Sequence, residues 1–138
     1  MIATVQAVSY FYATVPDRPD DACRLLSRLA EAGVNLLAFS AIPVGPEYTQ
    51  LVLFPDDPRL LEQIADTVGF ALTGPQRAFL AQGDDKLGAI ADIYGKLSEV
   101  GASVYASTGV TDGRGGFGYI LYVRPENFER AEEALKSL

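Results

Sequence analysis

The sequence of 138 residues contains no histidine, no tryptophan and a single cysteine. Histidine is the commonest general base and the commonest metal ligand, so its absence argues against most catalytic and metal-binding sites. The lone Cys23 cannot form an internal disulfide, and its place in an amphipathic stretch predicts a small, at least half-buried side chain. We therefore expect no catalytic centre, no bound metal and no cofactor.

The sequence also lacks a run of Lys or Arg, a basic N-terminal segment and any apolar stretch of the ~20 residues that a membrane span needs. Its formal charge is −7 at pH 7, from 18 acidic and 11 basic residues. Such a charge repels phosphate backbones and anionic membrane surfaces. These features predict a cytoplasmic protein that binds neither nucleic acid nor membranes.

Hydrophobic residues make up 49% of the chain, enough to build a substantial core. They follow one pattern that occurs twice. Between Asp85 and Gly101, and again between Asp17 and Gly33, apolar residues recur at three- and four-residue steps. Each stretch predicts an amphipathic helix with an acidic residue at its N-cap and a glycine after its last turn.

The segments around these helices predict the order strand, helix, strand, strand, helix, strand, which is the ferredoxin-like βαββαβ unit. In the first copy we expect strands at 7–15, 34–42, 48–54 and 70–73 and helices at 19–32 and 56–68. In the second copy we expect strands at 77–82, 102–107 and 117–123 and helices at 86–100 and 125–135. The fold class is therefore α+β, with two ferredoxin-like units side by side in domains 1–74 and 75–138. The second unit is expected to lack its last strand, and residues 2–5 are a candidate to cover the vacant edge.

Each copy carries the same short motif. Its residues are Asp17-Arg-Pro19 with Gly33-Val-Asn35-Leu36 in the first copy, and Asp85-Lys-Leu-Gly88 with Gly101-Ala-Ser103-Val104 in the second. This motif resembles that of the ACT domain family, and the resemblance covers about residues 7–138. The chain is thus similar to a tandem pair of ACT domains with no catalytic domain attached. The resemblance implies a regulatory module that binds a small ligand, usually an amino acid, where two ACT units meet with their helices on one face.

The start of the later helix is the candidate site for the ligand's carboxylate, with Asp85, Lys86, Leu87 and Gly88. A helix N-terminus offers free N–H groups and a positive dipole end. Gly88 has no Cβ to obstruct the approach, and Lys86 adds a positive charge. In the first copy three carboxylates, Asp17, Asp20 and Asp21, should repel such a ligand, so we expect the two helix starts to differ.

Asn35 can donate and accept hydrogen bonds toward a zwitterion, and Ser103 is its shorter counterpart in the second copy. With Leu36 and Asp17 they complete the candidate ligand-binding set. Simpler roles remain open for these residues. Asp17 and Asp85 can serve as helix caps alone, Gly88 can serve packing alone, and Asn35 can satisfy turn backbone.

Gly113-Arg-Gly-Gly-Phe-Gly118 matches the dinucleotide fingerprint G-x-G-x-x-G, but it lies between two predicted strands. That fingerprint has to join a strand to a helix, so we expect a hairpin tip instead. The sequence thus favours an amino-acid-sensing module that forms a homodimer. The alternatives are an interaction-only ferredoxin-like module and a small enzyme of the same fold that uses Tyr and Asp residues.

Overall fold

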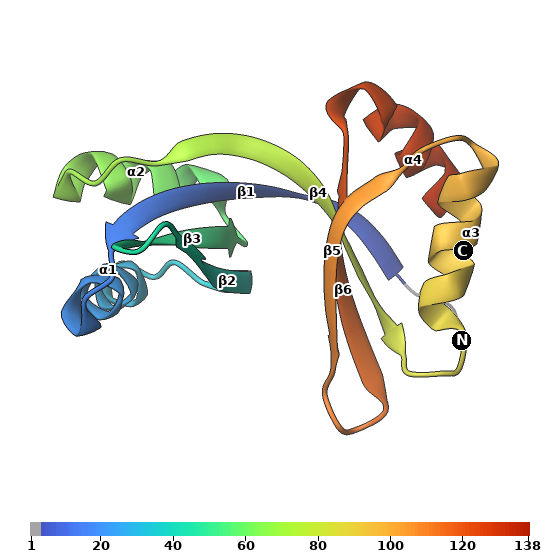
Figure 1. Ribbon diagram of the computed structural model, residues 1–138, viewed down its shortest axis with the longest axis horizontal. Helices are drawn as coiled ribbons and strands as arrows, with labels where there is room; N and C mark the ends of the chain where they lie inside the picture. The colour runs from blue at the N-terminus through green and yellow to red at the C-terminus, as the bar shows by residue number, and fades with distance from the viewer. Residues whose placement is uncertain (1–3) are drawn as a thin grey trace. The chain divides into compact units, whose positions relative to one another are not determined.

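The computed structural model describes residues 4–138, which divide into two compact units (Figure 1). The first unit is Ser9–Gln76, and the second is Arg77–Leu138 together with Thr4–Val8. The elements are β1 (Thr4–Pro16), α1 (Pro19–Glu31), β2 (Leu36–Val44), β3 (Tyr48–Pro55), α2 (Pro58–Val68), β4 (Thr73–Asp84), α3 (Ala89–Glu99), β5 (Val104–Thr111), β6 (Gly116–Val123), the 3₁₀ turn η1 (Pro125–Asn127) and α4 (Phe128–Leu135).

In the first unit the strands are ordered β2-β3-β1-β4, and β3 runs antiparallel to both of its neighbours. Helices α1 and α2 cover one face of this sheet. Their apolar stripes, which include Leu29 and Leu61, pack with Phe11, Leu51 and Leu53 of β1 and β3 in one core. The predicted ferredoxin-like arrangement of the first copy is therefore confirmed.

The second unit repeats this plan with the order β1-β4-β6-β5, and α3 and α4 lie on the same side of its strands (Figure 1). Its core joins Phe79 of β4, Ile93 of α3, Leu121 of β6 and Phe128 of α4. The rings of Phe79 and Phe128 stack with their centroids 4.3 Å apart. The helix face of the second copy is thus built as the apolar periodicity predicted.

The beginning of β1 provides the strand that the second copy appeared to lack. The hydroxyl of Thr4 donates to the carbonyl oxygen of Gln82 over 3.3 Å, and Val5 packs against the core between β4 and α3. Of the segment 2–5 that we considered for this edge, residues 2 and 3 lie outside the described residues. Residues Thr4–Val8 therefore belong with the second unit, whereas the predicted domain 1–74 included them.

β4 is one strand where the sequence predicted two strands and a turn. The prediction of a short strand at 70–73, ended by a turn at Gly74, was wrong, because β4 runs without a break from Thr73 to Asp84. Gly74 adopts φ +132°, and a Cβ at this position would lie 2.9 Å from the carbonyl oxygen of Tyr10. The glycine thus lets β4 approach β1 closely rather than turning the chain.

Local signals explain the ends of the other elements. Asp57 is the N-cap of α2 and accepts a hydrogen bond from the backbone N–H of Leu60, as its acidic start predicted. Gly69 ends α2 in the left-handed conformation. The glycine-rich stretch 113–118 spans the connection of β5 to β6 and the start of β6, which confirms that it joins two strands.

Candidate functional site

The residues from Asp85 to Gly88 form an exposed connection between β4 and α3, and the side chain of Leu87 is fully exposed. α3 begins at Ala89, and its N-cap is Gly88 in the left-handed conformation, with φ 85°. The expectation that Asp85 caps this helix was therefore wrong. Because Gly88 breaks the helical path, Asp85 lies before the break, where its backbone N–H donates to the carbonyl oxygen of Gly115 over 2.7 Å.

This helix start nevertheless has features that suit an anion. A Cβ at Gly88 would meet nothing within 4 Å, so the space beside its backbone is open. The ammonium of Lys86 lies 3.8 Å from a carboxylate oxygen of Asp92, and both side chains are more than half exposed. Solvent screening makes such a pair weak, so Lys86 can turn toward another anion at little cost.

The start of α1 is less negative than its three acidic residues predicted, because two arginines lie beside one of them. Its N-cap is Arg18, without a side-chain cap, so Asp17 does not cap the helix. Asp21 has a side chain that is 15% exposed, and it pairs with Arg18 over 2.7 Å and with Arg24 over 3.7 Å. These two guanidinium groups offset the repulsion that three clustered carboxylates were expected to produce.

The remaining candidates lie at the other ends of the helices. Asn35 follows α1 and is exposed, and its carbonyl oxygen accepts from the backbone N–H of Asp56 over 2.9 Å. Leu36 begins β2 and packs partly against the core of the first unit. Within each unit, these residues are separated from the helix start by the length of the helix, about 16 Å for the 11 residues of α3.

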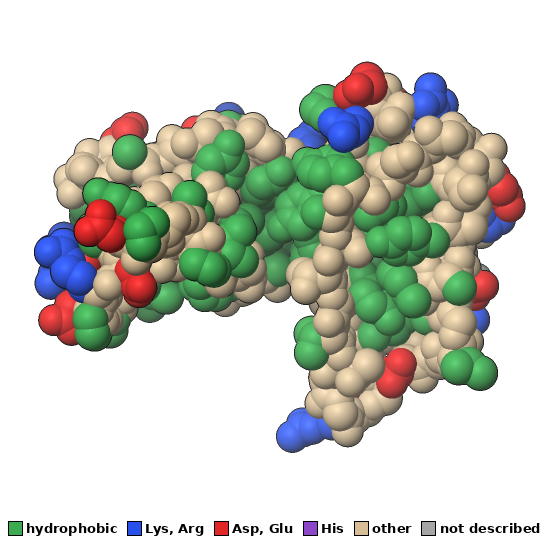
Figure 2. Space-filling view, viewed as in Figure 1, with side chains coloured by type: hydrophobic (Ala, Val, Ile, Leu, Met, Phe, Trp, Pro, Cys, Tyr) green, Lys and Arg blue, Asp and Glu red, His purple; other side chains and the backbone are tan. Residues whose placement is uncertain are grey.

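Ser103 lines a cavity of about 310 Å³ in the second unit, between the end of α3 and the start of β5. Tyr94 and Ser98 of α3 line the same cavity, and the hydroxyl of Tyr94 lies 2.7 Å from that of Ser107 on β5. Figure 2 shows hydrophobic side chains gathered between β5, β6 and α3. Residues 85–88 are not among those that line this cavity, so the structure places the predicted carboxylate and zwitterion contacts of the second unit apart.

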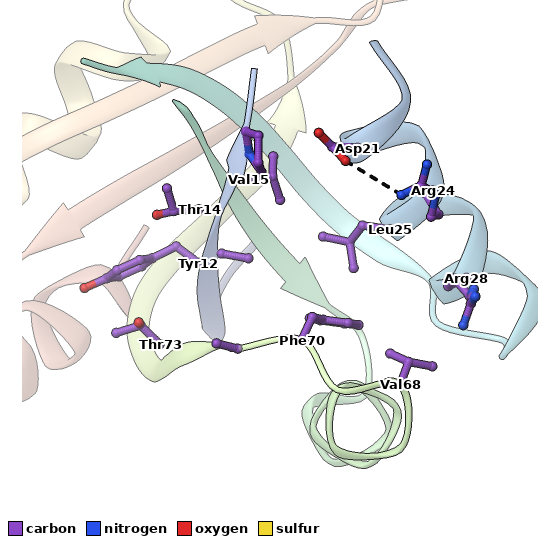
Figure 3. A pocket seen from close by; sticks show the side chains of 13 residues that line it. Tyr12, Thr14, Val15, Asp21, Arg24, Leu25, Arg28, Val68, Phe70 and Thr73 are labelled. Atoms are coloured by element: carbon purple, nitrogen blue, oxygen red, sulfur yellow. Dashed lines mark ion pairs between the residues drawn. The ribbon is translucent and has the colours of Figure 1, made fainter. Parts of the chain in front are cut away.

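A larger cavity, of about 440 Å³, lies in the first unit (Figure 3). It is bounded by the end of β1, one flank of α1 and the connection from α2 to β4. None of the predicted ligand-binding residues lines it. The sequence signal that could have indicated it is the pair Arg24 and Arg28, four residues apart beside the apolar stripe of α1.

Since the chain has no histidine, the candidate metal ligands among residues 4–138 are acidic side chains and Cys23. In this described range, no group of three or more His, Cys, Asp or Glu side chains could hold a metal ion. Cys23 is exposed, with its sulfur 4.0 Å from the hydroxyl of Ser27, so the expectation of a half-buried cysteine was wrong. No helix in the described part of the chain is long and apolar enough to cross a membrane.

Comparison with known proteins gives a likeness of structure and none of sequence. No protein-family model and no curated protein matches the chain. Among solved structures, protein BT0572 from Bacteroides thetaiotaomicron is similar over 96% of this chain and 89% of its own, with a TM-score of 0.80 and 17% identity. The regulatory subunit of aspartate kinase from Thermus thermophilus is similar over 99% of this chain and 96% of its own, with a TM-score of 0.68 and 16% identity.

A structure of the aspartokinase alpha and beta subunits is also similar, with a TM-score of 0.63 and 16% identity over 99% of this chain and 96% of that chain. At such low identity these likenesses establish a shared fold. The protein has an ACT-type fold of two ferredoxin-like units. The prediction of two ferredoxin-like units is therefore confirmed, and the function has to be argued separately.

Proposed function

We propose that this protein is a regulatory, non-catalytic module of the cytoplasm that binds an amino acid or a similar small zwitterion. The observation that carries the proposal is the similarity, over 99% of this chain, to a protein described as the regulatory subunit of aspartate kinase. The likeness also covers 96% of that subunit, so it extends over both ferredoxin-like units of this chain.

The proposed ligand site lies where two ACT-type units meet, with the predicted domains 1–74 and 75–138 each contributing to such a junction. Residues 85–88 receive the carboxylate, since the backbone beside Gly88 is open and Lys86 is only weakly paired. Asn35 and Ser103 contact the zwitterion from the opposite helix ends. Because each helix separates its two ends, this proposal requires the helix start of one unit to meet the helix end of another.

Thermal unfolding in the presence of each of the twenty amino acids tests the proposal. A ligand that binds only the folded state stabilises it by about 2.7 kcal/mol at ~100 times its dissociation constant. We expect one or a few amino acids to raise the midpoint, and no shift with any of them contradicts the proposal.

The site itself is tested by comparing Gly88→Asp with Gly88→Asn. Both variants place a side chain in the left-handed conformation at φ 85°, which costs about 1 kcal/mol of stability, so the apo midpoint falls in both. Only Asp adds a negative charge, so we expect the ligand response to be weaker in Gly88→Asp than in Gly88→Asn. An equal ligand response in the two variants would contradict the placement of the ligand's carboxylate at this helix start.

A second candidate function is dimerisation without a metabolite, which the edge strand β2 favours. β2 has a single neighbour, β3, and four of its large apolar side chains are at least 40% exposed: Leu37, Phe39, Ile42 and Val44. An exposed apolar edge can pair with the same edge of a second copy. Sedimentation analysis is expected to detect a homodimer that Phe39→Lys weakens and Thr108→Lys, on the edge strand β5, does not. A dimer together with no response to any amino acid would favour this second function.

A further inference from the structure

The 440 Å³ cavity of the first unit combines an apolar floor with a cationic rim, and it uses none of the residues proposed for the zwitterion site. We propose that it binds a small organic acid, with one carboxylate on an apolar body and no ammonium group. Its volume is within the range of about 300 to 1,000 Å³ that is usual for small-molecule sites. This inference is independent of the proposed function.

The cavity exists because β4 does not extend along the whole of β1. The contact of Thr4 with Gln82 and that of Tyr10 with Gln76 show that the two strands run antiparallel. Continuing the register of these two contacts places Thr73, the first residue of β4, near Tyr12 and Ala13 of β1. The last residues of β1, 14–16, therefore extend past the start of β4, and the cavity opens beside them.

The floor of the cavity suits an apolar body. Leu25 of α1 is buried, Val15 of β1 and Phe70 are half-buried, and all three pack at the core of the first unit. Val68, at the end of α2, is 36% exposed and lines the same space. Figure 3 shows these side chains arranged around the space between α1 and β1. A ligand with an aliphatic or aromatic body would remove this apolar surface from water.

The rim of the cavity favours a carboxylate. Arg24 and Arg28 project from α1 four residues apart, and both line the cavity (Figure 3). Arg24 shares the carboxylate of Asp21 with Arg18, whereas the guanidinium of Arg28 makes no ion pair or hydrogen bond with any of residues 4–138. A guanidinium binds a carboxylate through two parallel hydrogen bonds, so Arg28 is the group that receives the ligand.

The same rim disfavours a free amino acid. The ammonium group of an amino acid lies one carbon from its carboxylate, so it would come close to both arginines. The nearest acidic group that lines the cavity, Asp21, already pairs with Arg18 and Arg24. Like charges this close repel each other. The cavity therefore discriminates against amino acids by charge, which separates its ligands from those of the proposed zwitterion site.

Isothermal titration calorimetry with 4-methylpentanoate tests the proposal on the full chain. Its amide, 4-methylpentanamide, has the same shape without the charge, and leucine is the same acid with an ammonium group added. We expect the acid to bind, and the amide to bind at least tenfold more weakly. Arg28→Gln is expected to weaken binding of the acid about tenfold, because a hydrogen-bonded charge is lost. Arg59→Gln, an exposed arginine on α2 that does not line the cavity, serves as the matched control and is expected to leave binding unchanged.

A second variant, Ala71→Phe, fills the cavity from an exposed position on its wall and is expected to abolish binding of the acid. Circular dichroism establishes that each variant is folded. The proposal is overturned by failure of the acid to bind at millimolar concentration, by equal binding of acid and amide, or by equal effects of Arg28→Gln and Arg59→Gln. If leucine binds at the zwitterion site, its binding should be unchanged in Arg28→Gln. Loss of leucine binding in this variant therefore also overturns the organic-acid proposal. If no amino acid shifts the unfolding midpoint, the proposed function fails, but the organic-acid proposal is still decided by the calorimetry.

Discussion

The contribution of the N-terminal part of β1 to the second unit can be tested with one conservative substitution, Val5→Ala. Val5 is half-buried and packs against the core of the second unit. The substitution removes two methyl groups, worth about 0.8 kcal/mol each when fully buried, so a half-buried position should lose about 1 kcal/mol. For a chain of 138 residues this corresponds to a fall in the unfolding midpoint of about 3 to 5 °C.

The matched control is Gln6→Ala, because Gln6 is the next residue of β1, is exposed and points to the other face of the strand. We expect it to change the free energy of unfolding by less than about 0.5 kcal/mol. Urea unfolding followed by circular dichroism gives the two free energies. Hydrogen exchange shows which unit is destabilised. Val5→Ala should reduce amide protection in α3 and β6 more than in α1 and β3. Equal stability of the two variants, or a loss of protection confined to α1 and β3, would refute the assignment of this strand to the second unit.

Three further outcomes follow from particular contacts. Gly74→Ala should destabilise the protein by at least about 1 kcal/mol in chemical unfolding, because its Cβ would lie 2.9 Å from the carbonyl oxygen of Tyr10 at φ +132°; an unchanged midpoint contradicts the close approach of the strands. Asp57→Ala should cost about 1 kcal/mol by losing the N-cap of α2, and Asp57→Asn much less. The pKa of Asp112 lies below its ordinary value of 3.8 because two backbone N–H groups of its hairpin donate to the carboxylate. The stabilisation that these two hydrogen bonds give the folded state is therefore present above pH 3.8 and is lost as the pH falls through the lower folded-state pKa of Asp112. An NMR titration of Asp112 measures this pKa, and a midpoint at or above 3.8 would contradict the prediction.

The sequence predicted most helices and strands because their apolar periodicity is local. The stripe of α1 that includes Leu29, and that of α2 that includes Leu61, both lie in the core as expected. The N-terminal strand of the second unit could not be assigned from such periodicity, and residues 2–5 were only a candidate for the vacant edge. Its partner lies 78 residues away, as the contact of Thr4 with Gln82 shows, and a local pattern contains no information on such pairing.

The local structure at the candidate site was predicted less well, because it depends on backbone conformation. A glycine in a helical pattern is compatible with a first turn or with a left-handed break, and Gly88 forms the break. The cavity beside Arg28 was missed for another reason. The cavity arises from where β4 starts relative to β1. The Gly74-Pro75 pair is typical of a turn, so the sequence predicted a turn where β4 begins.

The passage of β1 and β4 through both units limits how this protein can be dissected or recombined. Residues 9–76 contain β2, β3 and the parts of β1 and β4 that belong to the first unit in one contiguous stretch, so they are suited to transfer into another polypeptide as a single graft. A fragment that begins at Arg77 leaves behind the strand from Thr4 to Val8. A transplant of the second unit would therefore have to be a circular permutant, with that strand moved behind Leu138.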